Sequence, residues 1–187
     1  MISLEAAIQK RDITEALHIL EHDPAQAQAN TKLGVSILML ALYYEVSELV
    51  VPIRSRLDSI TFFEAAATGE IEAVKTALQA DPTLCNAYAP DGFTVLGLAI
   101  FFRQPAIVDL LLAHGADVNL AARNARQVAP IHAACARQDL ESLAKLLALG
   151  ADSNAAQESG VRPLQQARAS GNTEMERMLR EAGAVEV

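Results

Sequence analysis

Two stretches of this chain repeat one another and decide its fold. The sequence Gly92-Phe-Thr-Val-Leu-Gly-Leu-Ala99, followed by Ile107-Val-Asp-Leu-Leu-Leu-Ala-His-Gly-Ala-Asp-Val-Asn119, recurs as Pro130-Ile-His-Ala-Ala134 followed by Leu143-Ala-Lys-Leu-Leu-Ala-Leu-Gly-Ala-Asp-Ser-Asn154. A looser third copy covers residues 160–167 and 171–184. Internal similarity at a fixed period indicates a repeat architecture, in which each unit buries its apolar face against its neighbours.

One alanine at the same place in every copy extends the period over the whole chain. The six alanines follow one another at steps of 34, 24, 34, 35 and 33 residues: Ala7, Ala41, Ala65, Ala99, Ala134 and Ala167. We predict that they lie in buried helices, because so small a side chain lets a neighbouring unit approach closely.

These residues resemble the ankyrin repeat, whose pattern is roughly G-x-T-P-L-H-x-A-A-x-x-G-x-x-x-x-V-x-x-L-L-x-x-G-A-D-x-N. The resemblance is strong in the fourth and fifth units and weak in the first two. It implies an all-α solenoid of stacked antiparallel helix pairs with short hairpin-like finger loops. It also implies one domain over residues 1–187, divided into units 1–30, 31–57, 58–88, 89–121, 122–155 and 156–187.

Several residues of the repeat also predict local structure from their chemistry alone. Gly115, Gly150 and Gly183 follow the second helix of their units, where a left-handed residue often ends a helix. Asp and Asn at 117–119 and 152–154 suit a turn, since their short side chains bond to nearby backbone groups. The motif histidine is present only as His132. Buried anchors of the first helices are expected at Leu38, Phe62, Leu96, Ile131 and Leu164.

The spacing predicts two irregular fingers. The 24-residue step is about ten residues short, so residues 54–60 must join the second and third units directly; we expect a shortened hairpin and a local change in curvature there. In contrast, Asn119 to Pro130 spans two positions more than the equivalent Asn154 to Pro163. The finger that contains Arg123 and Arg126 should therefore be two residues longer.

Charge and composition narrow the classes of partner and the compartment. The net charge of −8 would repel a phosphate backbone, so we expect no nucleic-acid binding. The most apolar stretch, residues 35–44, is too short to cross a bilayer, so no membrane association is expected. Two cysteines far apart, Cys85 and Cys135, fit a reduced cytoplasmic setting.

All eight aromatic residues lie between positions 43 and 102. Four of them, Tyr43, Tyr44, Phe101 and Phe102, occupy the two variable places at the end of the first helix. In proteins that the chain resembles, this helix end and the finger tips line the concave groove that binds partners. The four rings are therefore predicted interface anchors, and the alternative is that they pack internally between the second and fourth units.

The finger tips supply the remaining candidates for contact with a partner, because binding residues concentrate on loops that a rigid scaffold positions. On this basis we expect contacts, or else merely solvated turns, at Tyr88, Asp91, Phe93, Arg123, Arg126 and Glu158.

No motif indicates catalysis, a metal or a cofactor. His18 and His22 have a spacing that could hold one metal ion, but a surface pair is the expected reading. His132 and Cys135 could suggest a base and a nucleophile, yet both occupy ordinary repeat positions. We therefore predict a protein that is not an enzyme and needs no cofactor.

The predicted function is protein binding, by a small adaptor or inhibitor that presents its concave face to a partner. The alternative is a regulatory or accessory subunit of an enzyme. A monomer is expected, because polar residues such as Glu176 and Arg180 replace apolar ones in the last unit and would cap the stack.

Overall fold

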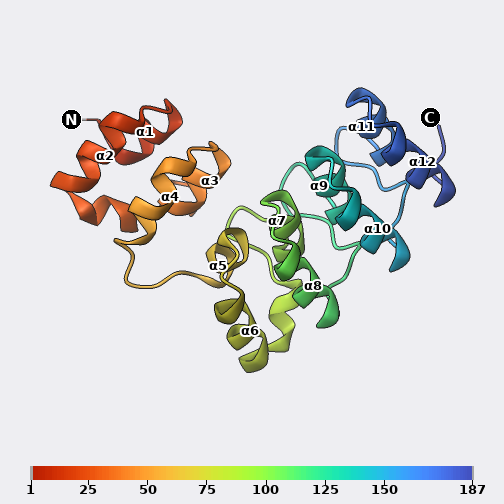
Figure 1. The fold of residues 1–187 in the computed structure, drawn as a ribbon, viewed down its shortest axis with the longest axis horizontal. Coiled ribbons are helices and arrows are strands. Elements are labelled where there is room, and N and C mark those ends of the chain that lie inside the picture. Colours follow the sequence, from red (N-terminus) through yellow and green to blue (C-terminus); the bar gives the residue numbers. More distant parts are fainter. Residues whose placement is uncertain (1, 187) are drawn as a thin grey trace.

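The computed structural model describes residues 2–186, and the regular structure in them is helical. Consecutive helices are joined in twos by turns of two or three residues, and each pair packs on the next (Figure 1). The pairs are α1 (Leu4–Gln9) with α2 (Ile13–His22), α3 (Ile37–Tyr43) with α4 (Ser47–Arg54), α5 (Phe62–Thr68) with α6 (Ile71–Ala80), α7 (Val95–Phe101) with α8 (Pro105–Ala113), α9 (Pro130–Arg137) with α10 (Leu140–Ala148), and α11 (Pro163–Ala169) with α12 (Thr173–Glu181). Short 3-10 helices follow α2 (η1, Pro24–Gln28) and α6 (η2, Pro82–Asn86). The prediction of an all-α stack of helix pairs is confirmed.

The six aligned alanines share one backbone role. All are at most 2% exposed, and the carbonyl of each accepts a hydrogen bond of 2.9–3.1 Å from the backbone N–H five residues later. This bond closes the turn between the paired helices around a residue with positive φ, four positions after the alanine. The residues in that left-handed conformation are Arg11, Glu45, Gly69, Arg103, Gln138 and Gly171.

The second helices of the later pairs end as the glycines predict. Gly115, Gly150 and Gly183 all have φ above +80°. The neighbouring asparagines then connect successive pairs: Asn119 donates from Nδ2 to the carbonyl of Gly150 at 3.0 Å, and Oδ1 of the same residue accepts from the backbone N of Asp152 at 2.8 Å. Asn154 repeats both bonds with Gly183 and Val185. Turn residues thus also fix the spacing between units.

His132 likewise holds two units together. Its Nδ1 accepts a 3.1 Å bond from the backbone N of Ala129, and its Nε2 donates to the carbonyl of Ala155 in the next finger at 3.0 Å. The motif histidine thus ties the start of α9 to the finger before α11.

The fingers differ in length as the spacing predicts. A hydrogen bond from Ala89 N to Phe93 O closes the finger before α7 around three residues, and Gln157 N to Val161 O does the same before α11. Before α9 the equivalent bond joins Ala122 N to Val128 O around five residues. The loop that this bond closes is therefore two residues longer than the other two.

The connection between α4 and α5 does not form the shortened hairpin that we expected. Residues 55–61 contain no strand bridge, and the bridges in the described residues are Asn30 with Ser36 and Tyr88 with Thr94. With ten residues missing, too little chain remains to turn back on itself. The segment is instead held by the Arg56 guanidinium, which donates to the carbonyls of Leu20 and Pro52.

Loss of this finger brings the second and fourth units together. Gly34, in the finger before α3, lies so close to Pro90, in the finger before α7, that a Cβ on Gly34 would be 3.4 Å from the Pro90 Cβ. In Figure 1 the pairs on either side of α5 and α6 rise to the same side of the molecule, so that the stack forms an arc.

The buried residues form two main cores and a small third one. The first core joins α1 to α4, the second joins α5 to α12, and the partly buried Ile60 of the connection packs against both. The third consists of Met39, Ala67, Ala89 and Leu98, covered by partly buried aromatic rings. Four of the five predicted anchors are at most 2% exposed. Phe62 is the exception and is only partly buried, because no finger precedes α5 to cover it.

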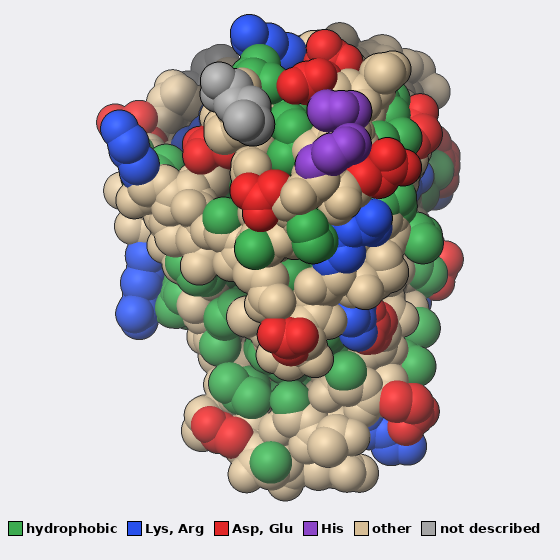
Figure 2. Space-filling model, turned by 90° about the vertical axis from the view of Figure 1, so that its left-hand side faces the viewer, with side chains coloured by type: hydrophobic (Ala, Val, Ile, Leu, Met, Phe, Trp, Pro, Cys, Tyr) green, Lys and Arg blue, Asp and Glu red, His purple; other side chains and the backbone are tan. Residues whose placement is uncertain are grey.

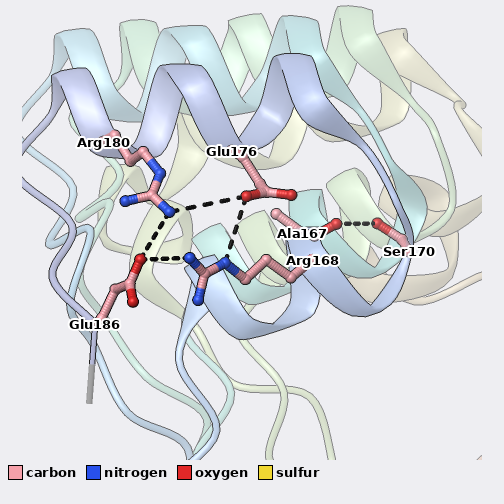
Figure 3. A network of polar contacts seen from close by, with 6 residues as sticks. All are labelled: Ala167, Arg168, Ser170, Glu176, Arg180 and Glu186. Carbon is pink, nitrogen blue, oxygen red and sulfur yellow. Dashed lines mark hydrogen bonds and ion pairs between the residues drawn. The ribbon is translucent and has the colours of Figure 1, made fainter.

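The two ends of the stack are polar. Figure 2 shows the N-terminal end, where a histidine pair lies side by side among scattered acidic and basic side chains; His18 and His22 stack with ring centroids 4.2 Å apart. At the other end, Arg168 of α11 and Arg180 of α12 form ion pairs with Glu176 and Glu186 across the outward face of the last pair (Figure 3).

Candidate functional site: the concave groove

A groove of about 680 Å³ runs along the inner side of the arc. Its walls come from the end of α3, the fingers before α7, α9 and α11, and the inner helices α7, α9 and α11. Concave sites with an apolar lining and a few convergent polar groups are the usual places for binding. The groove is lined by Tyr43, Asp91, Phe93, Thr94, Gly97, Leu98, Phe101, Asn124, Ala125, Arg126, Val128, His132, Ala133, Ala136, Gln157 and Gln166.

Tyr43 lies at one end of the groove and contacts aromatic residues of the fourth helix pair, because no finger precedes α5 to separate them. Its ring centroid lies 6.4 Å from that of Phe93, 6.5 Å from that of Phe101 and 5.3 Å from that of Phe102. Its hydroxyl donates a 2.6 Å hydrogen bond to Oδ2 of Asp91. Burial, and next the Asp91 carboxylate, raise the pKa of Tyr43 well above its usual value, so the phenol stays protonated and remains a donor.

The structure brings together five of the ten residues predicted to contact a partner: Tyr43, Asp91, Phe93, Phe101 and Arg126 all line the groove. Phe102 lies beside them as part of the small third core. Tyr44 is separate from this group, because it packs against the core of α1 to α4. The contact between the rings of Tyr43 and Phe102 therefore joins the second and fourth units, and Tyr43 also lines the groove.

Two of the three remaining predicted residues form a pair of their own. The Arg123 guanidinium carbon lies 3.9 Å from the centroid of the Tyr88 ring, in cation–π geometry. Neither residue lines the groove. Glu158, on the finger before α11, is exposed and also lies outside the groove lining. The finger residues thus divide into those that face the groove and those outside it.

Several groove residues were absent from the sequence-based candidates. Asn124 holds the long finger in place: its Nδ2 donates to the Asp91 carbonyl and its Oδ1 accepts from the backbone N of Arg126. Gln157 and Gln166 contribute amides from the last unit, and Ala136 contributes an exposed methyl at the end of α9. Its position in the repeat, which aligns with Tyr43 and Phe101, could have indicated Ala136 as a groove residue. The residue type gave no such signal, because alanine is common throughout the chain.

A second link across the arc lies beside the groove. Arg137, at the end of α9, makes a 3.0 Å ion pair with Glu45, 92 residues earlier, and its guanidinium carbon is 5.1 Å from the Phe101 ring centroid. Nε of Arg137 is buried and has no hydrogen-bond partner among the described residues. The arc is therefore tied from the second unit to both the fourth and the fifth.

The candidates for chemistry have structural roles. Burial lowers the pKa of His132, whose two ring nitrogens already bond to Ala129 and Ala155. Burial also raises the pKa of the Cys135 thiol to about 12, which leaves it a poor nucleophile at neutral pH. Residues 2–186 bring together no group of three or more His, Cys, Asp or Glu side chains that could hold a metal ion. Over the same residues, no helix is both long and apolar enough to span a bilayer.

Comparison with known proteins identifies the repeat. Residues 91–124 match the family model described as ankyrin repeat. The human protein named Ankyrin repeat and SOCS box protein 6 is 41% identical over 99 residues, which cover 49% of this chain and 23% of the relative. The mouse protein of that name is 40% identical over 96 residues, with 48% and 23% covered. Human BCL-6 corepressor-like protein 1 is 35% identical over 96 residues, 51% of this chain and 5% of that protein.

The chain thus spans less than a quarter of the length of the first relatives that it matches. The matched segment includes the finger and the helix pair in which the motif is strongest, and the same turn geometry recurs in all six helix pairs. The chain therefore contains an ankyrin repeat, and its stack of helix pairs is consistent with an ankyrin-repeat solenoid.

Proposed function

We propose that this protein is an adaptor or inhibitor that binds a partner protein through its concave groove. Ankyrin repeats are protein–protein interaction modules. The observation that carries the proposal is the groove itself, where the aromatic rings of Phe93 and Phe101 lie beside polar groups from three fingers. Aromatic anchors at the centre of a concave surface are the usual energetic core of an interface.

The partner in this proposal is a protein rather than a nucleic acid or a membrane. The chain carries a net charge of −8, which disfavours a phosphate backbone. A cytoplasmic location is part of the same proposal, because both cysteines are free and buried rather than paired. The proposal also includes a monomeric state and the division of the chain into the six units given above.

A groove-filling substitution tests the proposal. Ala136 is exposed and lines the groove, so Ala136→Trp should fold and place an indole where a partner would lie. Ala144→Trp is the matched control, since Ala144 is exposed on α10, outside the groove lining. Both variants are first compared with wild type by circular dichroism.

Each protein is then immobilised and used to capture proteins from an extract of the source cells. The proposal expects at least one protein that is captured by wild type and by Ala144→Trp but lost with Ala136→Trp. Equal capture by all three would show that the groove is not the binding surface.

A further inference from the structure

The groove has two charged side chains in its lining, and they are not equally available. Both carboxylate oxygens of Asp91 are already in use: Oδ1 accepts from the backbone N of Phe93 and Oδ2 accepts from the Tyr43 hydroxyl. The guanidinium of Arg126 takes part in no ion pair or hydrogen bond with any other residue between 2 and 186. The positive charge of the groove is therefore free to bind a ligand, whereas its negative charge is satisfied internally.

The fingers around Arg126 add further cations without ion pairs. Arg123 lies over the Tyr88 ring, and Arg162 offers its backbone N to Gln165, but neither guanidinium has a carboxylate partner in the described chain. The fingers before α9 and α11 contain one acidic side chain, that of Glu158. The backbone N of Glu158 donates to the carbonyl of Arg126 at 3.3 Å. In a protein of net charge −8, this rim is a local positive region.

The uncharged lining suits a polypeptide in extended conformation. Phe93, Phe101 and Val128 offer apolar surface for a large side chain. Gln157 and Gln166 offer side-chain amides, which can both donate to and accept from a peptide backbone. The Oε1 atom of Gln166 is buried and has no hydrogen-bond donor within the described part of the chain, so rotation of this amide toward the groove would let a backbone N–H of a ligand satisfy it.

We propose that the groove binds an extended acidic segment of the partner protein, in which a carboxylate side chain pairs with Arg126 and a neighbouring large apolar side chain packs on Phe93 and Phe101. This inference rests on the proposed function and adds the chemistry of the partner. An Arg guanidinium forms two parallel hydrogen bonds with a carboxylate, which gives such a contact direction as well as attraction.

Selection from a library of random twelve-residue peptides displayed on phage tests this proposal without knowledge of the natural partner. The immobilised protein is used as bait, and the same library is panned against Ala136→Trp to remove peptides that bind elsewhere. The enriched peptides should combine Asp or Glu with Leu, Ile, Phe or another large apolar residue. The strongest peptide is then synthesised with a fluorescent label, and its affinity is measured by anisotropy.

Charge-reversal variants supply the decisive comparison. Arg126→Glu should weaken binding of the peptide about tenfold or more, because it replaces an attractive contact with a repulsive one. Lys75→Glu is the matched control: Lys75 is exposed on α6, outside the groove lining, and the substitution changes the net charge by the same amount. This control should change the affinity less than about twofold. Glu158→Gln should strengthen binding.

The outcomes separate this inference from the proposed function. Enriched peptides that are neutral or basic, yet lose binding in Ala136→Trp, would overturn the acidic segment and leave the groove as an interface. An equal loss of affinity in Arg126→Glu and Lys75→Glu would also overturn it, because a general charge effect would then explain the result. Failure to enrich any peptide on wild type over Ala136→Trp would contradict a peptide ligand, and binding that Ala136→Trp does not alter would count against both proposals.

Discussion

The hydroxyl of Tyr43 donates a 2.6 Å hydrogen bond to Asp91, 48 residues later in the chain. Tyr43 ends the first helix of the second pair, whereas Asp91 lies in the finger of the fourth pair. The bond is possible because no finger precedes α5 and stands between them. It links the core of α1 to α4 with the rest of the stack, beside the groove proposed to bind a partner.

Replacement of Tyr43 by Phe should lower stability by about 1–2 kcal/mol, since it removes a hydrogen bond to a charged acceptor from a largely buried site. Tyr44→Phe is the control, because the Tyr44 hydroxyl has no hydrogen-bond partner between residues 2 and 186. That change should stay within about 0.5 kcal/mol of wild type. Urea unfolding followed by circular dichroism measures both, and similar effects of the two changes would show that the bond contributes little.

The left-handed residues between paired helices make a second prediction. Arg11 has φ +54°, a conformation that costs a side chain about 1–2 kcal/mol and that glycine adopts freely. Gly69 and Gly171 occupy the equivalent positions in other pairs. Arg11 is exposed, and its side chain makes no ion pair in the described residues, so Arg11→Gly should raise stability by about 0.5–1 kcal/mol.

Lys10→Gly is the control for this effect. Lys10 is equally exposed but right-handed, with φ −85°, so glycine there should lower stability by roughly 0.5–1 kcal/mol. Thermal unfolding of the two variants should shift the midpoint in opposite directions. A lower midpoint for Arg11→Gly would mean that the turn does not hold Arg11 in this conformation.

Much of the fold follows from the sequence, because the repeat positions carry local geometry. The alanine register, the glycines after α8, α10 and α12, and the loop-bonding His132 depend on contacts within a unit or with the next unit. A motif of about 33 residues encodes contacts of that range. The left-handed Arg11, Glu45, Arg103 and Gln138 were not predicted, since the pattern indicates such a residue only where it is glycine.

The candidate site was only partly predictable, because it depends on contacts between units that are not neighbours in the chain. The ion pair of Glu45 with Arg137 spans 92 residues and follows from the bend at the missing finger. Gln157 and Gln166 reach the groove through the same curvature. Tyr43 and Phe101 could be proposed from their repeat position, but that position alone does not show that Tyr43 packs internally and lines the groove at once.

His132 should make stability depend on pH. Burial lowers its pKa in the folded state below the ordinary value of 6.5, so the unfolded chain binds a proton more readily. The stability that comes from keeping this imidazole neutral is fully present above about pH 6.5 and is lost as pH falls toward the folded-state pKa. The free energy of unfolding of wild type should therefore fall between about pH 7.5 and about pH 5.

His132→Gln removes this contribution without removing the bond at the start of α9. Gln165, at the equivalent place in the last pair, accepts a 2.8 Å bond from Arg162 N through its side chain, so glutamine can make the bond to Ala129 N. The variant should lose about 1 kcal/mol near neutral pH with the bond to Ala155, and should lose less than wild type on acidification. Parallel pH profiles for the two proteins would show that His132 does not titrate in this range.

The polar end of the stack makes the last prediction. Glu176 and Arg180 take the places that Val108 and Leu112 have in the fourth pair, where both side chains belong to or pack on the continuous core. In the last pair they instead form ion pairs with Arg168 and Glu186 (Figure 3). Glu176→Val combined with Arg180→Leu would leave an apolar face that another copy could cover, so self-association should appear in sedimentation velocity at micromolar concentration.

Glu174→Val combined with Arg177→Leu is the matched control for this pair. It removes the ion pairs of Arg177 with Glu174 and Glu181 from the same helix α12 and adds the same two apolar side chains, but at the places that the exposed Ala106 and Asp109 have in the fourth pair. This control should sediment as the wild type does, with wild type a monomer. Self-association of both double variants to the same extent would attribute the effect to added apolar surface in general, and a monomeric Glu176→Val/Arg180→Leu protein would show that the ion pairs are not what keeps the end of the stack closed.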